Sequence, residues 1–319
     1  MNKSTRNLLI IFVILAAVVY LFFMRKEKIS TENIKEKLFT ADSSKIDKIE
    51  IVRTDISITL EKVNGQWMVT KPVNYQADTN SVCPILGNLQ DFKIESVTSE
   101  KPENFHNYLD SALHPVVTAY QGGKQLGTFE VGKYAISYSN AYIKLPNENR
   151  ILLASNLTSN NFTKPLKDFR YKLITSIPTP GLTKVVFKST DSNKVDFTAT
   201  KDSSGRWFIG SDSIPKNNMD GFTNSLANFM TEDFKDTVPA AFPVPTYTLT
   251  VYSPQPITIN FYKDTSTTPS SYTVQVSNIK QLFKFSDSFA ANMMKKRTDF
   301  IPAPAQKKEE PKKDDKKKK

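Results

Sequence analysis

The sequence is poor in the residues that build catalytic and metal sites. Its 319 residues include one cysteine and two histidines. The single cysteine, Cys83, excludes an internal disulfide bond, and we interpret it as a small buried apolar side chain on a helix. His106 and His114 lie outside any H-E-x-x-H pattern, whereas a catalytic zinc ion takes about three protein ligands. We therefore interpret both histidines as structural and expect no metal site.

Motifs for nucleophilic or phosphate chemistry are also missing or incomplete. The sequence contains no G-x-S-x-G nucleophile elbow. Gly127 to Lys133 spells G-x-x-x-x-G-K, but Tyr134 follows where Mg²⁺ binding needs Ser or Thr. The spacer, residues 128–131, itself has the pattern of a strand, which leaves no loop to surround a phosphate. Glu95 and Glu100 are isolated carboxylates. We therefore expect no catalytic residue and no cofactor, and a protein that is not an enzyme.

The positive charge is concentrated at the two ends of the chain. The formal net charge is +11, of which residues 1–30 carry +4 and residues 307–319 another +4. The body between them is close to balanced, and it lacks the basic surface that phosphate backbones require. The sequence therefore predicts no nucleic-acid partner. The tail at 302–319 is rich in Lys, Pro and acidic residues and has too little apolar surface to order itself.

One long apolar segment predicts a membrane anchor. The run from Leu8 to Met24 contains no charged residue and lies between Arg6 and Arg25. As a helix it measures about 25 Å, near the lower limit for crossing a bilayer. It is followed by neither a small-residue cleavage site nor a cysteine, so we expect an uncleaved single span in lipid. The flanking charges nearly balance, and the short N-terminal tail favours a body outside the cytoplasm.

The body of the chain contains an internal repeat. Asn64-Gly65-Gln66-Trp67 returns 140 residues later as Ser204-Gly205-Arg206-Trp207, and Leu86-Gly87-Asn88-Leu89 returns at the same spacing as Leu226-Ala227-Asn228-Phe229. Asp168-Phe169 and Asp299-Phe300 close the two segments. Such a repeat, kept in register over a turn and a helix, predicts two copies of one folding unit.

Each copy has the pattern of an antiparallel α+β unit. Apolar residues alternate at 56–60 and 195–199, as in half-buried strands, and each hairpin turn is followed by an apolar stripe at helical spacing. That stripe includes Val82, Leu89 and, in the second copy, Phe229, and Pro84 is expected in the first turn of its helix. More hairpins follow, rather than alternating βαβ units. We expect five segments: a membrane anchor at 1–28, a stalk at 29–42, repeats at 43–177 and 182–301, and a disordered tail at 302–319.

The first copy resembles a known bacterial family. The residues that carry the resemblance are Ile58-Thr59-Leu60-Glu61-Lys62, Asn64-Gly65-Gln66-Trp67, Thr70-Lys71-Pro72-Val73, Ala77-Asp78, Phe129 to Lys133, Ala141 to Leu145, and Leu166 to Arg170. They are similar to the family catalogued as domain of unknown function 4340. The second copy lacks the Lys-Pro-Val run and the arginine after Asp299-Phe300. The resemblance implies a membrane-anchored protein associated with ABC-type export or gliding-related transport, and it brings no catalytic residues.

Three hypotheses for function follow from these features. The first is a non-enzymatic accessory or scaffold protein of a transport complex in the inner (cytoplasmic) membrane. It would contact membrane proteins through exposed tyrosines such as Tyr134, Tyr138, Tyr252 and Tyr262. The second is a module that binds carbohydrate or another envelope polymer. The third is a hydrolase with a site assembled around Asp110 and the two histidines. Asn156 and Asn161 match glycosylation acceptors, but such matches are common by chance.

Overall fold

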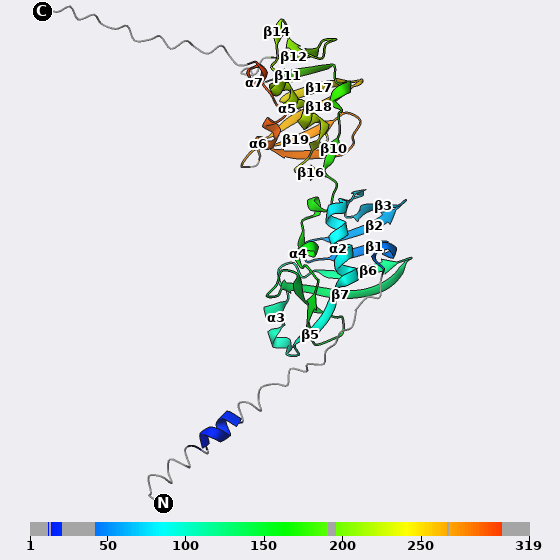
Figure 1. The fold of residues 1–319 in the computed structure, drawn as a ribbon, viewed down its shortest axis with the longest axis vertical. Coiled ribbons are helices and arrows are strands. Elements are labelled where there is room, and N and C mark those ends of the chain that lie inside the picture. Colours follow the sequence, from blue (N-terminus) through cyan, green and yellow to red (C-terminus); the bar gives the residue numbers. More distant parts are fainter. Residues whose placement is uncertain (1–11, 13, 21–41, 191–195, 267, 302–319) are drawn as a thin grey trace, which may run out of the picture. The chain divides into compact units, whose positions relative to one another are not determined.

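A computed structural model describes residues 12, 14–20, 42–190, 196–266 and 268–301 (Figure 1). The chain divides between Tyr171 and Lys172 into two compact units. Within the described residues each unit contains one antiparallel sheet of nine strands and a few helices. This confirms the α+β class expected from the sequence.

The first sheet is built from nine strands that lie between Lys48 and Ser155. Their bounds are β1 (Lys48–Val52), β2 (Ser57–Val63), β3 (Gln66–Lys71), β4 (Tyr75–Gln76), β5 (Lys93–Ser99), β6 (Val116–Gln121), β7 (Lys124–Tyr134), β8 (Asn140–Lys144) and β9 (Ile151–Ser155). They lie in the order β4-β3-β2-β1-β6-β7-β8-β9-β5. Most neighbours in the sheet are joined by hairpins, and β5 reaches the far edge to pair with β9.

Local sequence explains the hairpins. Asn64 and Gly65 join β2 to β3 with φ angles of 49° and 82°, which is the geometry that an Asn-Gly pair adopts most readily. Gly122 and Gly123 do the same between β6 and β7, with φ angles of 57° and 77°. In the second unit Gly205 has a φ of 87° in the predicted turn. The turn that the repeated motif predicts is therefore confirmed in both units.

The helix of the first unit, α2 (Thr79–Asp91), crosses one face of the sheet (Figure 1). Asp78 caps it by accepting a hydrogen bond from the backbone N–H of Asn80 at 2.9 Å, which stabilises a helix N-terminus. The expected stripe is buried in the same core as the strands, and its members include Val82, Ile85 and Leu89. Pro84 lies in the second turn rather than the first, because the helix begins at Thr79.

Between residues 42 and 171, five short helical segments accompany the sheet and α2. They are η1 (Ser43–Lys45), η2 (Pro102–Asn104), α3 (Phe105–Tyr108), α4 (Asn160–Thr163) and η3 (Leu166–Asp168). Phe169, directly after η3, is fully buried. Its carbonyl oxygen accepts the backbone N–H of Asp78 at 2.8 Å, so the end of the unit is fastened to the start of α2. Arg170 is also buried, and its guanidinium lies 4.6 Å from the ring centre of Tyr75.

The second unit repeats the arrangement of the first. Its main strands are β11 (Lys184–Ser189), β12 (Phe197–Lys201), β13 (Trp207–Ile209), β14 (Asp212–Ser213), β16 (Asp233–Lys235), β17 (Tyr247–Ser253), β18 (Gln255–Asp264), β19 (Ser271–Val276) and β20 (Leu282–Ser286). Their order, β14-β13-β12-β11-β17-β18-β19-β20-β16, matches that of the first sheet strand for strand.

Helix α5 (Lys216–Ala227) stands where α2 stands in the first unit. Phe229, expected in its apolar stripe, instead belongs to β15 (Phe229–Met230), which pairs with β10 (Leu173–Thr175). Three further segments are η4 (Thr179–Gly181), α6 (Asp287–Ala291) and α7 (Arg297–Phe300). β10 thus pairs within the second unit, which begins at Lys172.

Aromatic side chains fill the core of the second unit. Phe300 lies within 6 Å of three other phenylalanine rings, measured between ring centres: Phe187 at 5.5 Å, Phe222 at 5.5 Å and Phe197 at 5.9 Å. Such pairs add to the stabilisation from burial alone. The motif that closes each repeat thus supplies a buried phenylalanine near the main helix. These residues are Phe169 in the first unit and Phe300 in the second.

The expected ends of the chain lie mostly beyond the described residues. Within the described part, no helix has both the length and the apolar character needed to cross a membrane. Of the anchor at 1–28, only residues 12 and 14–20 are described, and they are helical. The stalk, apart from Asp42, the tail from 302 and the predicted strand residue Val195 lie outside the described residues.

Candidate functional site

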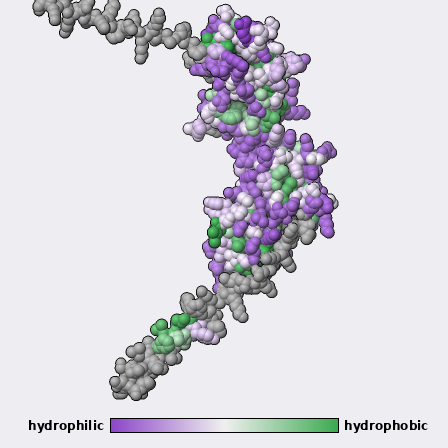
Figure 2. All heavy atoms as spheres, viewed as in Figure 1, coloured by the Kyte–Doolittle hydropathy of each residue, from purple (hydrophilic) through white to green (hydrophobic). Residues whose placement is uncertain are grey.

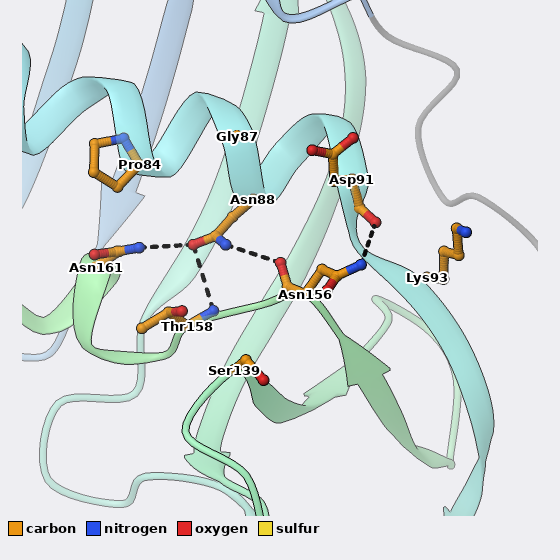
Figure 3. Close-up of a pocket in the computed structure, with 9 residues that line it drawn as sticks. All are labelled: Pro84, Gly87, Asn88, Asp91, Lys93, Ser139, Asn156, Thr158 and Asn161. Carbon is orange, nitrogen blue, oxygen red and sulfur yellow. Dashed lines mark hydrogen bonds between the residues drawn. The ribbon is translucent and has the colours of Figure 1, made fainter.

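A polar cavity of about 610 Å³ lies on the first unit (Figure 3). The last turns of α2 supply Gly87, Asn88 and Asp91 to its wall. The segments after β9 supply a second wall, which includes Asn156 and Asn161. These segments meet because β9 ends beside β5, which continues directly from α2. The cavity is therefore formed by parts of the chain about 70 residues apart, brought together by the order of strands in the sheet.

Asn88 organises the interior of this site. Its Oδ1 accepts hydrogen bonds from Asn161 Nδ2 at 2.8 Å and from the backbone N–H of Thr158 at 3.4 Å. Its Nδ2 donates to the carbonyl oxygen of Asn156 at 2.8 Å. Figure 3 shows this one amide joined to all three neighbours. A single side chain on α2 therefore fixes both the loop after β9 and the start of α4.

The loop after β9 is held in a special backbone conformation. Asn156 has a φ of 58°, in the left-handed region that asparagine adopts more readily than most residues. Its Nδ2 donates to the carbonyl oxygen of Asp91 at 3.4 Å. The next residue, Leu157, is fully buried and donates its backbone N–H to the carbonyl oxygen of Ser139 at 2.8 Å. The polar wall is thus tied to α2 on one side and to the approach to β8 on the other.

Charged groups in the cavity wall are few and opposite in sign. Asp91 and Lys93 both line it, and Pro84 is the one apolar ring among the lining residues. The remaining polar lining consists of amide and hydroxyl groups. Because amides and hydroxyls both donate and accept hydrogen bonds, the site presents a mixed, nearly neutral surface.

A second feature of the first unit is a group of exposed apolar side chains at the end of β7 and in the loop before β8. Tyr134, Ile136 and Tyr138 are 53%, 106% and 71% exposed, respectively. The rings of the two tyrosines lie 4.8 Å apart between centres. Hydrophilic residues cover most of the visible face of each unit in Figure 2, so this group of exposed apolar side chains differs from the general surface. We call Tyr134, Ile136 and Tyr138 the β7–β8 triad.

The residues that the sequence singled out for hydrolysis have separate local partners. His106 is exposed on α3. His114 Nε2 lies 3.3 Å from Glu130 Oε2, and Lys144 Nζ lies 2.9 Å from the other oxygen of Glu130. Asp110 accepts the backbone N–H groups of residues 112 and 113 at 2.9 and 3.1 Å, as in a local turn. In the described part of the chain, no group of three or more His, Cys, Asp or Glu could hold a metal ion.

The segment that resembles a phosphate-binding loop lies entirely within β7, as the strand pattern predicts. Gly132 is needed there for close packing. A Cβ atom at this position would lie 2.9 Å from the carbonyl oxygen of Tyr142 and closer still to that of Tyr108. Lys133, which follows, directs its Nζ to the carbonyl oxygens of His106 and Asn107 at 3.1 and 3.3 Å. These contacts give both residues a structural explanation.

Two expectations about exposure were wrong. Cys83 is exposed rather than buried, because it lies outside the stripe that α2 turns toward the sheet. Tyr262, expected at the surface, is 8% exposed and donates to Gln275 Oε1 at 2.9 Å. Tyr252 is half-buried, with Lys184 Nζ 3.9 Å from its ring centre. Glu95 accepts a hydrogen bond from Ser155 at 2.6 Å, while Glu100 is exposed.

The asparagine cavity was not foreseen from the sequence, although signals were present. Asn88 belongs to the repeated Leu-Gly-Asn-Leu motif, and Asn156 and Asn161 each match a glycosylation acceptor. The sequence alone could not show that these three asparagines lie in one cavity. It depends on the pairing of β9 with β5, between residues about 60 apart.

Comparison with curated proteins and with solved structures returns no significant match. Comparison with family models returns a match to residues 67–251, which spans the end of the first hairpin through β17. The matched region therefore takes in the polar cavity, the β7–β8 triad and much of the second sheet. Because it covers more than half of the chain, the protein belongs to the family described as Domain of unknown function (DUF4340).

Proposed function

We propose that the protein is a non-enzymatic accessory or scaffold subunit of a transport complex in the inner (cytoplasmic) membrane. The apolar run from Leu8 to Met24 supports a single N-terminal transmembrane helix, with the body outside the cytoplasm. The matching strand orders of the two sheets support two copies of one unit. The observation that carries the proposal is the β7–β8 triad.

An exposed isoleucine between two exposed tyrosines is a suitable docking element. Burying Ile136 against a partner would contribute about 1.5–3 kcal/mol, and tyrosine is enriched among the residues that dominate binding energies. The loop is also held in place. Ala135 donates its backbone N–H to the carbonyl oxygen of Asn140 at 2.8 Å, and Asn140 donates to that of Ser137 at 2.9 Å. A loop ordered before binding loses less conformational entropy on docking.

The second unit does not carry an equivalent triad. The connection between β18 and β19, which corresponds to that between β7 and β8, is formed by residues 265–270. Its sequence is Thr-Ser-Thr-Thr-Pro-Ser, which has no large apolar side chain. The repeated fold therefore does not require apolar residues at this position. The triad of the first unit is therefore not required by the fold, which is what we expect of residues that serve a specific contact with a partner.

The proposed partner is a membrane-embedded subunit of the complex. Residues 25–47 connect the apolar run to β1, and a chain of that length reaches about 80 Å at most. The first unit would thus be kept near the membrane from which its partner protrudes. Carbohydrate or envelope-polymer binding is the alternative function, favoured by the polar cavity.

The test is a pull-down of the full-length tagged protein from its native membranes in mild detergent, read by mass spectrometry. We expect enrichment of a multi-span permease together with its ATPase. Ile136→Asp should reduce that enrichment about tenfold or more, because a charge would be buried in the contact. Val244→Asp is the matched control, since Val244 is 77% exposed in the second unit.

Two results would count against the proposal. One is recovery of the protein without any multi-span membrane protein. The other is equal loss of the partner with Ile136→Asp and Val244→Asp, which would show a general effect of added charge. Thermal unfolding of both variants in the same detergent would identify a loss caused by misfolding.

A further inference from the structure

We propose that the asparagine cavity of the first unit binds a neutral, polyhydroxylated ligand of the saccharide class. The inference does not rest on the docking role of the β7–β8 triad, because none of the three triad residues lines the cavity. It rests on the chemistry of the cavity wall, on the position of the cavity at the end of α2, and on the hydrogen bonds that order the site before a ligand arrives.

The wall matches the hydrogen-bonding capacity of sugar hydroxyls. Each hydroxyl of a saccharide donates one hydrogen bond and accepts others, and a carboxamide side chain offers both an acceptor and two donors. Asn88, Asn156 and Asn161 place three carboxamides in one cavity. The side-chain amide of Asn161 donates one hydrogen bond, from Nδ2 to Asn88 Oδ1 at 2.8 Å. Asn161 lines a cavity of about 610 Å³, within the range of small-molecule sites.

An apolar ligand would find little surface to bury. Sites for apolar small molecules are lined mainly by hydrophobic and aromatic side chains. Among the residues that line this cavity, Pro84 is the one with an apolar ring, and Gly87 has no side chain. A ligand rich in hydroxyl groups is therefore favoured over an apolar one.

The electrostatics disfavour an anion. Asn88 and Asp91 lie in the last turn of α2, and the C-terminus of a helix carries partial negative charge. The Asp91 carboxylate adds a full negative charge, against which Lys93 supplies one positive charge. The helix C-terminus and the Asp91 carboxylate would thus repel a phosphate group, and only Lys93 would attract it. A hard cation such as Ca²⁺ takes six to eight oxygen ligands, and Asp91 is the one carboxylate in the cavity wall.

Hydrogen bonds within the protein hold the site in place. Asn88 holds Asn161 and the loop at Asn156 with hydrogen bonds of 2.8 Å each. Leu157 anchors the same loop in the core. A polar site fixed in this way loses less conformational entropy when it binds a ligand.

The experiment is isothermal titration calorimetry with the full-length protein in a detergent that has no sugar headgroup. The probes are maltotetraose, cellotetraose and the tetramer of N-acetylglucosamine, with inorganic phosphate as the anionic probe. We expect at least one tetrasaccharide to bind with a Kd of about 1 mM or tighter, and phosphate not to bind. Cys83 is exposed and directly precedes Pro84 of the cavity wall, so a fluorophore on this sole cysteine gives a second readout of saccharide binding.

Two substitutions remove amides from the cavity wall. Asn156→Gly keeps a residue that tolerates a φ of 58°, and Asn161→Ala removes a second amide that lines the cavity. Each should weaken saccharide binding about tenfold. Asn80→Ala is the matched control, because Asn80 lies on α2 but does not line the cavity. It should change the Kd less than twofold.

Three outcomes would overturn the inference. They are no heat and no fluorescence change with any tetrasaccharide at 10 mM, binding that Asn156→Gly and Asn161→Ala leave unchanged, and binding of phosphate in place of the saccharides. None of these bears on the β7–β8 triad, so the inference and the docking function can fail separately. If a variant does not fold, the wild-type titration and the Cys83 readout still decide whether the saccharides bind.

Discussion

The guanidinium of Arg53 holds both carboxylate oxygens of Asp55, with Nε donating to Oδ1 at 2.9 Å and Nη2 donating to Oδ2 at 2.8 Å. The remaining Nη1 donates to the carbonyl oxygen of Lys164 at 2.6 Å. The Arg53 side chain is almost fully buried, while that of Asp55 is half exposed. This pair fastens the β1–β2 turn to the end of α4.

The Arg53–Asp55 pair predicts a pH dependence of stability. The hydrogen bonds from Arg53 hold the pKa of Asp55 below its ordinary value. An unfolded aspartate has a pKa of about 3.9, so the contribution of the pair is complete above that pH. It is lost as the pH falls through the lower folded pKa. Because Asp55 is half exposed, solvent screening limits the contribution to about 1 kcal/mol.

The measurement is urea unfolding of Asp55→Asn against the wild-type residue at several pH values. The Trp207→Phe background leaves Trp67 of the first unit as the one tryptophan, so its fluorescence reports that unit. The difference in unfolding free energy should be constant from about pH 7 to 5 and shrink below about pH 4. A difference that stayed constant down to pH 2 would show that ionisation of Asp55 does not contribute.

Gly132→Ala should strongly destabilise the first unit. The added Cβ would meet the carbonyl oxygens of Tyr108 and Tyr142, and backbone atoms cannot rotate away as a side chain can. We expect a loss of about 3 kcal/mol in unfolding free energy. Gly87→Ala is the control within the same unit. It has no atom within 4 Å of the new Cβ in helix α2 and should stabilise by about 0.5–1 kcal/mol.

The unfolding free energy of both glycine variants is measured by Trp67 fluorescence during urea unfolding, in the Trp207→Phe background. Equal effects of the two substitutions would contradict the steric explanation for Gly132. The conformation of Gly132 is not otherwise restricted to glycine, since its φ is not positive. The loss therefore depends on the close approach of β8 and α3 alone.

Much of the fold was readable from sequence because its signals are local. Asn64-Gly65 and Gly122-Gly123 specify turns through their own backbone preferences. The exposure of Cys83 was also readable in principle. It follows Val82 by one residue, which turns it about 100° away from the buried stripe of α2. The residue type of Cys83 favours burial, whereas its position on the helix places it on the outer face.

Other features depend on contacts between distant segments. Phe229 has the spacing of a helical residue, but its pairing with β10 places it in a strand. Asn88 and Asn161 lie 73 residues apart and meet only through the order of the sheet. No hydrophobic periodicity or local motif in the sequence indicates this contact between the two amides. A polar site assembled in this way can be proposed only after the strands have been placed.

The closing phenylalanines should control the stability of their own units. Phe300 is 1% exposed and packs among three other phenylalanine rings. Phe300→Ala should therefore cost about 3–5 kcal/mol. In the Trp67→Phe background, Trp207 reports the second unit and its urea midpoint should fall. Phe289→Ala is a partial control, because Phe289 packs edge-to-face on Phe285 but is not fully buried, and its loss should be smaller. An equal or greater loss with Phe289→Ala would contradict a central role for Phe300.

The exposure of Cys83 gives a direct chemical test of helix α2. Cys83 lies on the outer face of the helix, next to Pro84, whose side chain is also exposed. The native full-length protein should therefore react with Ellman's reagent without denaturant and release one thiol equivalent per chain. Adding urea should not increase the final yield. A thiol that reacted only after unfolding would place Cys83 in the core, and it would require a rotation of α2 that also removes Asn88 from the cavity. The same experiment therefore checks the helical phase on which the proposed saccharide site depends.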